Sequence, residues 1–243
     1  MARAAKKTSG KAKPAKGRRR GVLGWLGFLA LRSMTILIVG VMLLVLLFAV
    51  VNPPVTHTMW KAYSMYGPLE RDWVPAEEMA PVMLRSVVAA EDANFCLHWG
   101  FDVAAIRAAI DEGSNRGAST LSQQTVKNVF LWQGRSWVRK ALETAITPAV
   151  EAVWTKRRIL EVYLNVAEMG EGVFGVEAAA QKAFGVSAAE LTPTQAARLA
   201  AVLPNPKERS AANPSNFVRK RAASIMDGAA TIRADGRAAC FED

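Results

Sequence analysis

The sequence predicts an all-α domain that follows one membrane-spanning helix. Residues 33–51 form a run of 19 residues without a charge, which is long enough to cross a hydrocarbon core of about 30 Å. From about residue 77 onward, apolar side chains recur at the spacing of a helix almost throughout. No alternating run in that region is long enough to predict a sheet.

The positive charge of the chain is concentrated before the apolar run. Residues 1–32 hold ten of the 31 Lys and Arg residues and no acidic residue, so the remainder is neutral, with 21 basic and 21 acidic side chains. A basic tail could by itself be a nucleic-acid arm. Because an apolar segment follows at once, we interpret the tail as a topology signal that contacts lipid headgroups, and we expect no nucleic-acid partner.

The apolar run differs from a cleavable signal peptide. It is longer than the apolar core of such a peptide, and Asn52, Pro53 and Pro54 follow it in place of small residues. Basic residues on its N-terminal side alone predict that the tail stays in the cytoplasm. We therefore expect a cytoplasmic tail (1–32), a transmembrane helix (33–51), an irregular connector (52–76) and a domain outside the cytoplasmic membrane (77–243).

Glycines and prolines divide the domain into short helical segments. The predicted helices lie near residues 77–92, 102–112, 119–131, 136–155, 157–168, 175–184, 193–202 and 215–233.

Cys96 and Cys240 are the two cysteines of the chain, and both would face an oxidising compartment. A disulfide would join the C-terminal end to the central part of the domain. The sequence does not give the Cα separation that a disulfide requires, so a bridge and two free thiols both stay open.

The first chemical motif is the adjacent pair Glu91 and Asp92 at the end of a largely apolar helix. Carboxylates in such surroundings are costly unless they are solvated, paired or used in chemistry. Taken alone, the pair is more typical of a solvated helix end than of a functional site.

The second motif follows Gly117 with Ser119 and Thr120, a pattern typical of a helix start. Free backbone N–H groups there, with Lys127 two turns further on, could receive an anion such as phosphate. Arg135 is a second cation that could reach the same anion. In the structural alternative, Ser119 is a helix cap and Arg135 a solvated loop residue.

The third motif centres on Glu151, which has strongly apolar neighbours and is therefore either paired or functional. Arg139 and Glu143, four residues apart, are interpreted as a surface pair. We find no spacing typical of a metal site or of a Ser-His-Asp triad. Two candidate carboxylates, Glu91 and Glu151, together with two cations suggest glycosyl transfer from a phosphate leaving group.

Five ordered blocks between residues 82 and 206 resemble the peptidoglycan glycosyltransferases of family 51. They are Glu91-Asp92 through Asp102; Gly117 through Asn128; Arg139-Lys140 through Glu143 and Glu151; Ile159 through Asn165; and Gly172 through Ala180. The resemblance implies a lysozyme-like helical fold. It is closest to the monofunctional members, because the chain has no room for a penicillin-binding transpeptidase domain.

The resemblance also implies a reaction and roles. Family members polymerise lipid II into glycan strands by an inverting transfer that releases undecaprenyl diphosphate. By this analogy Glu91 is the general base and Glu151 the second carboxylate. Lys127 and Arg135 contact the diphosphate. Ser119, Gln123 and Asn128 line the same cleft.

We expect no required cofactor, although Mg²⁺ or Mn²⁺ could assist at the diphosphate. The expected partners are lipid II, the nascent glycan, membrane lipids, and other proteins of cell-wall synthesis or division. These expectations would place the domain in the periplasm of a bacterium, anchored in the inner membrane.

The alternative functions are a lysozyme-like glycan hydrolase and a non-catalytic membrane scaffold. Residues 129–132 with Trp137 either enter the outer leaflet or pack internally.

Overall fold

The computed structural model of the chain describes residues 22–111 and 119–242. The chain divides into two compact units, Met1–Leu43 and Leu44–Asp243, which are described separately. The described part of the first unit belongs to helix α1 (Val22–Phe48). Within the described residues, α1 holds the one segment, Gly24–Phe48, that is long and apolar enough to cross a membrane. Most of the predicted basic tail and residues 117 and 118 lie outside the described residues.

The second unit begins with the last turn of α1. Val45 is fully buried, and its carbonyl oxygen accepts a hydrogen bond of 2.7 Å from Trp154 Nε1. The Arg158 guanidinium donates to the carbonyl oxygen of Phe48 over 3.1 Å. These contacts fasten the end of the apolar helix to the domain.

The domain is helical, as predicted. Its α-helices are α2 (His57–Tyr66), α3 (Pro81–Glu91), α4 (Val103–Asp111), α5 (Leu121–Phe130), α6 (Trp137–Val153), α7 (Lys156–Val166), α8 (Val176–Phe184), α9 (Pro193–Val202), α10 (Asn216–Ala234) and α11 (Ala239–Glu242). Short 3₁₀ turns occupy Ala76–Glu78, Phe95–Leu97 and Ala188–Glu190. The eight helices predicted from the sequence agree with α3 to α10 within a few residues at each end.

Helix α2 was not predicted, because residues 52–76 were interpreted as an irregular connector. Thr56 caps the helix by accepting a hydrogen bond from the Met59 amide, and Met59 and Ala62 are buried. The helix was missed because prolines lie on both sides of it and because only two of its residues, Met59 and Ala62, are buried.

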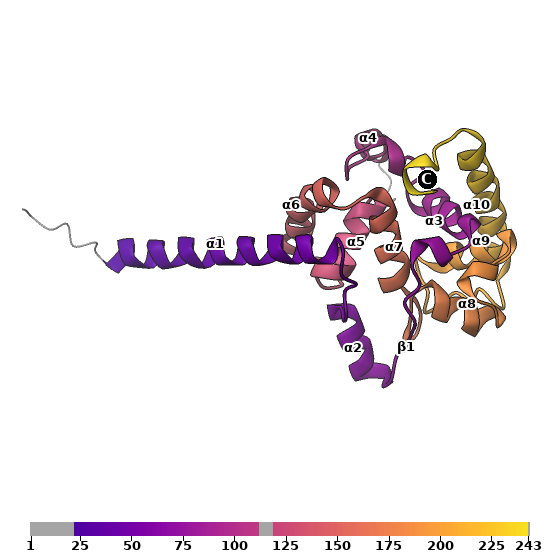
Figure 1. The fold of residues 1–243 in the computed structure, drawn as a ribbon, viewed down its shortest axis with the longest axis horizontal. Coiled ribbons are helices and arrows are strands. Elements are labelled where there is room, and N and C mark those ends of the chain that lie inside the picture. The colour runs from indigo at the N-terminus through magenta and orange to yellow at the C-terminus, as the bar shows by residue number, and fades with distance from the viewer. Residues whose placement is uncertain (1–21, 112–118, 243) are drawn as a thin grey trace, which may run out of the picture. The chain divides into compact units, whose positions relative to one another are not determined.

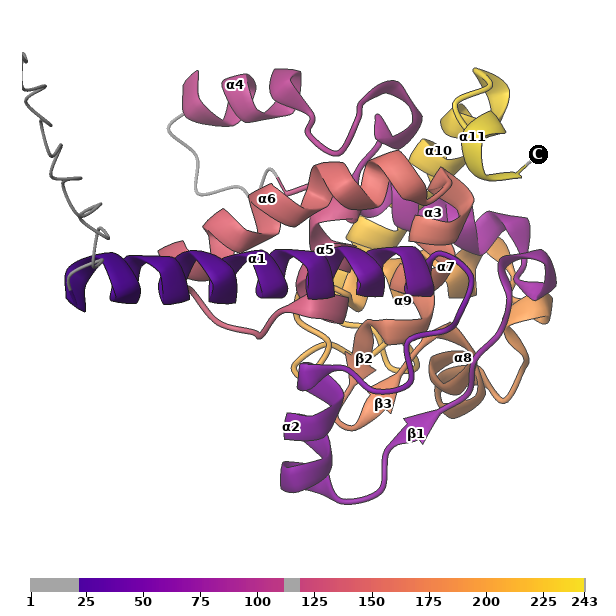
Figure 2. The ribbon, with the colours of Figure 1, turned by 60° about the vertical axis from the view of Figure 1, so that its left-hand side comes forward.

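A small sheet was also not predicted. Strands β1 (Glu70–Arg71), β2 (Glu168–Gly170) and β3 (Val173–Phe174) form it in the order β1-β3-β2. β1 runs parallel to β3 and β2 antiparallel to it, and all three lie against α8 (Figure 2). Strands of two or three residues are too short to give an alternating pattern, so the sequence could not indicate them.

The helices of the domain form two packed groups. α3, α9 and α10 pack together, and α5 packs against both α6 and α7 (Figure 1). The approach of α10 to α3 is close, since a Cβ atom added to Gly228 would lie 3.1 Å from Ala89 Cβ.

Residues 129–132 and Trp137, which were expected either to enter the outer leaflet or to pack internally, do not share one environment. Leu131 is buried, and the Phe130 ring lies 6.0 Å from that of Phe48 and 6.3 Å from that of Trp154. Trp137, in contrast, is 91 % exposed. Residues 130 and 131 therefore pack internally, while the side chain of Trp137 at the start of α6 is accessible to a membrane or to water.

Of the two states that the sequence left open, the structure has the disulfide between Cys96 and Cys240, with a Cα–Cα distance of 5.7 Å. Beside it, the rings of Phe95 and Phe241 lie 6.4 Å apart. The C-terminal helix α11 is thereby attached to the segment that follows Glu91.

Candidate active site

A groove of about 650 Å³ lies between the two helix groups. It is lined by Ala89, Ala90, Glu91, Asp92, Ala93, Asn94, Asp102, Ala105, Ser119, Thr120, Gln124, Lys127, Pro204, Arg209, Phe217 and Arg221. Three of the predicted site residues, Glu91, Ser119 and Lys127, therefore share one groove.

Glu91 is the last residue of α3 and is held by one of its two oxygens. Gln124 Nε2 donates to Glu91 Oε2 over 3.0 Å, whereas Oε1 is buried and has no partner in the described structure. A buried carboxylate oxygen without a donor is costly, so it is suited to receive a hydrogen bond from a bound molecule.

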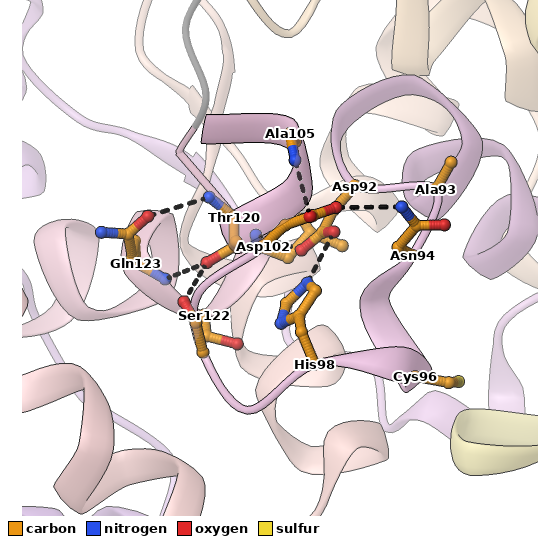
Figure 3. Close-up of polar contacts among 12 residues, drawn as sticks. Asp92, Ala93, Asn94, Cys96, His98, Asp102, Ala105, Thr120, Ser122 and Gln123 are labelled. Carbon is orange, nitrogen blue, oxygen red and sulfur yellow. Dashed lines mark hydrogen bonds and ion pairs between the residues drawn. The ribbon is translucent and has the colours of Figure 1, made fainter. Parts of the chain in front are cut away.

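Asp92 fixes the direction in which α3 ends. Its Oδ1 lies 2.9 Å from His98 Nε2 (Figure 3). Its Oδ2 accepts a 2.9 Å hydrogen bond from the Leu121 amide at the start of α5. Nearby, Asn94 Nδ2 donates to Asp102 Oδ2 over 2.9 Å. This network joins α3 to α5, and Glu91 is thereby placed opposite the side chains of α5.

The start of α5 decides which of two adjacent glutamines faces the groove. Thr120 is the N-cap, and Gln123 forms a reciprocal capping box with it (Figure 3). Gln123, which was predicted to line the cleft, is buried in this role and is not among the residues that line the groove. Gln124, which was not among the predicted site residues, contacts Glu91. Ser119 lines the groove, as predicted from the resemblance. It is not the helix cap, because Thr120 has that role.

Lys127 lies in the last turn of α5 and lines the same groove as Glu91. Burial lowers the pKa of Lys127, and the negative charges of Glu143 and Glu91 act against this effect. Lys127 thus stands within the electrostatic reach of two carboxylates.

A second group of charges lies on α6. The predicted ion pair between Arg139 and Glu143 is confirmed, and Lys140 joins it. The expected surface location was wrong, because Glu143 is only 2 % exposed. Lys140 Nζ also donates to Ser119 Oγ over 3.0 Å, which brings this cluster to the edge of the groove. The sequence signal was present, since Arg139, Lys140 and Glu143 share one helix face, but their burial was not visible.

Glu151 is buried, as its apolar neighbours predicted, but it does not line the groove. Ser122 Oγ and Lys156 Nζ both donate to its Oε1, the latter over 2.8 Å. Lys156 Nζ also donates to the carbonyl oxygen of His98 over 2.8 Å. A Cβ atom at Gly100, whose φ is +83°, would lie 3.1 Å from Glu151 Cγ. Glu151 therefore supports the turn that carries His98.

The remaining two predicted residues also lie outside the groove lining. Asn128 is buried, and its Oδ1 accepts a 3.0 Å hydrogen bond from Gln133 Nε2. Arg135 is exposed between α5 and α6, and no hydrogen bond or ion pair to it occurs within the described residues. The structure therefore places Glu91, Ser119 and Lys127 in one groove, and the lining of that groove does not include Gln123, Asn128, Glu151 or Arg135.

The described residues contain no group of three or more His, Cys, Asp or Glu side chains that could hold a metal ion. They offer a carboxylate with one unused oxygen in the same groove as the half-buried ammonium group of Lys127, with a further cationic cluster at the edge of the groove. Such an arrangement can accept a proton from a hydroxyl group and stabilise an anion that departs nearby.

A helical domain with this groove is suited to an enzyme that transfers a group from an anionic leaving group to a hydroxyl group. The model of a protein family described as Transglycosylase matches residues 59–230. The chain belongs to this transglycosylase family.

Three relatives are each named "Biosynthetic peptidoglycan transglycosylase". The chain is 67 % identical to that of Jannaschia sp. over 194 residues, covering 80 % of this chain and 81 % of the relative. It is 47 % identical to that of Rhodospirillum centenum (88 % and 96 % covered) and 48 % identical to that of Pectobacterium atrosepticum (87 % and 91 % covered). The family resemblance and the predicted glycosyltransferase activity are confirmed.

Proposed function

We propose that this chain polymerises lipid II into the glycan strands of peptidoglycan and releases undecaprenyl diphosphate. The observation that carries the proposal is the common groove of Glu91 and Lys127, in which one carboxylate oxygen has no protein partner. The family and the names of the relatives support the same reaction.

In this proposal Glu91 acts as the general base. Its carboxylate takes the proton of the acceptor 4-hydroxyl group as that oxygen attacks the anomeric carbon of the growing strand. The bond between the anomeric carbon and the diphosphate oxygen breaks, the bonding electrons leave with the lipid diphosphate, and the configuration inverts. Gln124 positions Glu91 through its hydrogen bond to the other oxygen.

The leaving diphosphate requires positive charge where its own charge increases. Lys127 supplies an ammonium group in the groove, and Lys140 supplies a second at its edge. Glu143 holds Arg139 and Lys140 in place, so we assign the second carboxylate role to Glu143 and a supporting role to Glu151. Arg135 is exposed and could reach a phosphate of a bound substrate.

The apolar helix α1 is compatible with single-pass anchoring, and the further details of location belong to the proposal. We infer a bacterial inner-membrane protein with its basic tail in the cytoplasm and its catalytic domain in the periplasm. Confinement of enzyme and polyprenyl substrate to one membrane raises their effective concentration. Exposed Trp137 and Val138 on α6 are suited to contact the bilayer beside the groove.

No cofactor is required in this reaction scheme. Should Mg²⁺ or Mn²⁺ assist, it would be held mainly by the diphosphate oxygens and water, as Mg²⁺ commonly is. Other proteins of cell-wall synthesis or division are further proposed partners.

The proposal is tested by offering the purified full-length protein in detergent either lipid II or finished glycan strands. We expect lipid II to be consumed, with polymeric glycan and undecaprenyl diphosphate as products, and the finished strands to stay intact. Shortening of finished strands with no consumption of lipid II would instead establish a hydrolase.

A further inference from the structure

The wall of the groove opposite α5 is formed by α10 and the loop after α9, and the scheme above assigns it no role. Phe217 and Arg221 lie four residues apart on α10, so they share one helix face, and both line the groove. Phe217 is 57 % exposed, which is unusual for a phenylalanine on the wall of a polar groove.

The ring of Phe217 is held in a defined arrangement. The Arg209 guanidinium lies 4.9 Å from its centroid, and Arg209 Nη1 donates to the carbonyl oxygen of Ala201 over 3.3 Å. One face of the ring thus has a cationic partner. The ring remains largely exposed, which gives the groove a flat apolar surface of the kind on which a pyranose ring stacks.

Arg221 adds an unused hydrogen-bond donor beside this surface. Its Nη2 donates to the carbonyl oxygen of Ala90 over 3.4 Å, which is the residue immediately before Glu91. Its Nε is buried and has no partner in the described structure. An unsatisfied buried N–H group is costly, so a bound acceptor atom would relieve it.

The two unpartnered polar atoms are therefore complementary in kind, and they belong to residues that line the same groove. Glu91 Oε1 lacks a donor, and Arg221 Nε lacks an acceptor, while Arg221 itself contacts the residue next to Glu91. A sugar carrying an N-acetyl group matches both, because it presents a hydroxyl donor, a carbonyl acceptor and an apolar ring face.

We propose that Phe217 and Arg221, with Arg209 behind the ring, form a saccharide subsite that binds an N-acetylated sugar of the substrate. The ring face stacks on Phe217, and the amide or hydroxyl oxygen accepts a hydrogen bond from Arg221 Nε. The subsite orients the hydroxyl group that Glu91 deprotonates, so the proposal rests on the proposed function.

A diphosphate is a weaker match to this wall. Arg209 and Arg221 already donate to backbone carbonyl groups, and an aromatic ring offers nothing to a phosphate. The ammonium groups suited to phosphate, Lys127 and Lys140, lie on α5 and α6.

The test uses full-length protein in detergent and compares Phe217→Ala, Phe217→Leu and Phe217→Tyr with wild type in lipid II polymerisation. We expect Phe217→Ala and Phe217→Leu to raise KM about fivefold to tenfold, the loss of roughly 1–1.4 kcal/mol of binding. Phe217→Tyr should restore it, because stacking requires a ring. The exposed Trp60 on α2 does not line the groove, so Trp60→Ala serves as the matched control with an unchanged KM.

A tetrasaccharide of N-acetylglucosamine, which has neither lipid nor diphosphate, is then used as an inhibitor. It should inhibit wild type and Phe217→Tyr, and inhibit Phe217→Leu at least fivefold more weakly. A Phe217→Leu variant with the KM of wild type overturns the subsite, as does inhibition that is equal in both proteins or absent from both. If wild type itself fails to polymerise lipid II, the proposed function is refuted instead.

Discussion

Gln124 binds Glu91 through one carboxylate oxygen and leaves the other without a protein partner. The same glutamine accepts a 3.3 Å hydrogen bond from the hydroxyl group of Tyr163, which is fully buried and whose pKa burial raises well above its ordinary value. Tyr163 therefore stays protonated and keeps donating. The chain Tyr163–Gln124–Glu91 fixes the orientation of the proposed base.

Replacing Gln124 should reduce the rate more than it reduces stability. We expect Gln124→Ala to lower kcat for lipid II polymerisation about tenfold, because Glu91 loses the contact that orients it. Gln123→Ala is the matched control. It removes half of a capping box, so we expect a loss of about 1 kcal/mol in the free energy of unfolding and a nearly unchanged kcat. Equal effects of the two variants on kcat would contradict these assignments.

The charge of Lys127 should limit activity at alkaline pH. Its pKa is lowered by burial, so it loses its proton at a lower pH than an ordinary lysine, and the leaving diphosphate then loses its partner. We expect kcat to fall on the alkaline side, and Lys127→Arg to move that fall to higher pH because arginine stays protonated. An alkaline limb at the same pH in both proteins would show that another group titrates there.

Glu143 and Glu151 should differ in what their loss affects. Glu143→Gln frees Arg139 and Lys140 beside the groove, and we expect kcat to fall about a hundredfold. Glu151→Gln leaves the largely buried side chain of Lys156 without its charge partner. We expect a loss of about 3 kcal/mol in the free energy of unfolding.

The measurements are kcat for lipid II polymerisation and chemical denaturation. A Glu151→Gln variant that keeps its stability but loses turnover would restore Glu151 to the role first predicted for it.

The disulfide between Cys96 and Cys240 should stabilise the domain, since it closes a long loop between the C-terminal helix and the segment after Glu91. We expect the double variant Cys96→Ser, Cys240→Ser to lose about 2–4 kcal/mol of unfolding free energy. Thiol counting under denaturing conditions checks the bridge itself. Two free thiols in protein isolated without reductant would refute the bridge.

Much of the helical fold could be predicted from the sequence, because α3 to α10 are delimited by apolar periodicity and by Gly, Pro and capping residues. Glu91 and Lys127 were identified by the same local patterns. The different roles of Gln123 in the helix cap and Gln124 in the groove were not predictable, because they depend on Thr120 being the N-cap in place of Ser119. Likewise, the i,i+4 spacing of Arg139 and Glu143 predicted a surface pair, and the burial of Glu143 depends on how α6 packs on α5, which the sequence does not show.

The central claim is that Glu91 removes a proton during glycan polymerisation. The most direct measurement is lipid II turnover by Glu91→Gln beside wild type in detergent, with thermal unfolding to show that both are folded. We predict that Glu91→Gln keeps its melting temperature within a few degrees and loses at least about a thousandfold in kcat. Polymerisation by the folded variant at close to the wild-type rate would contradict the account.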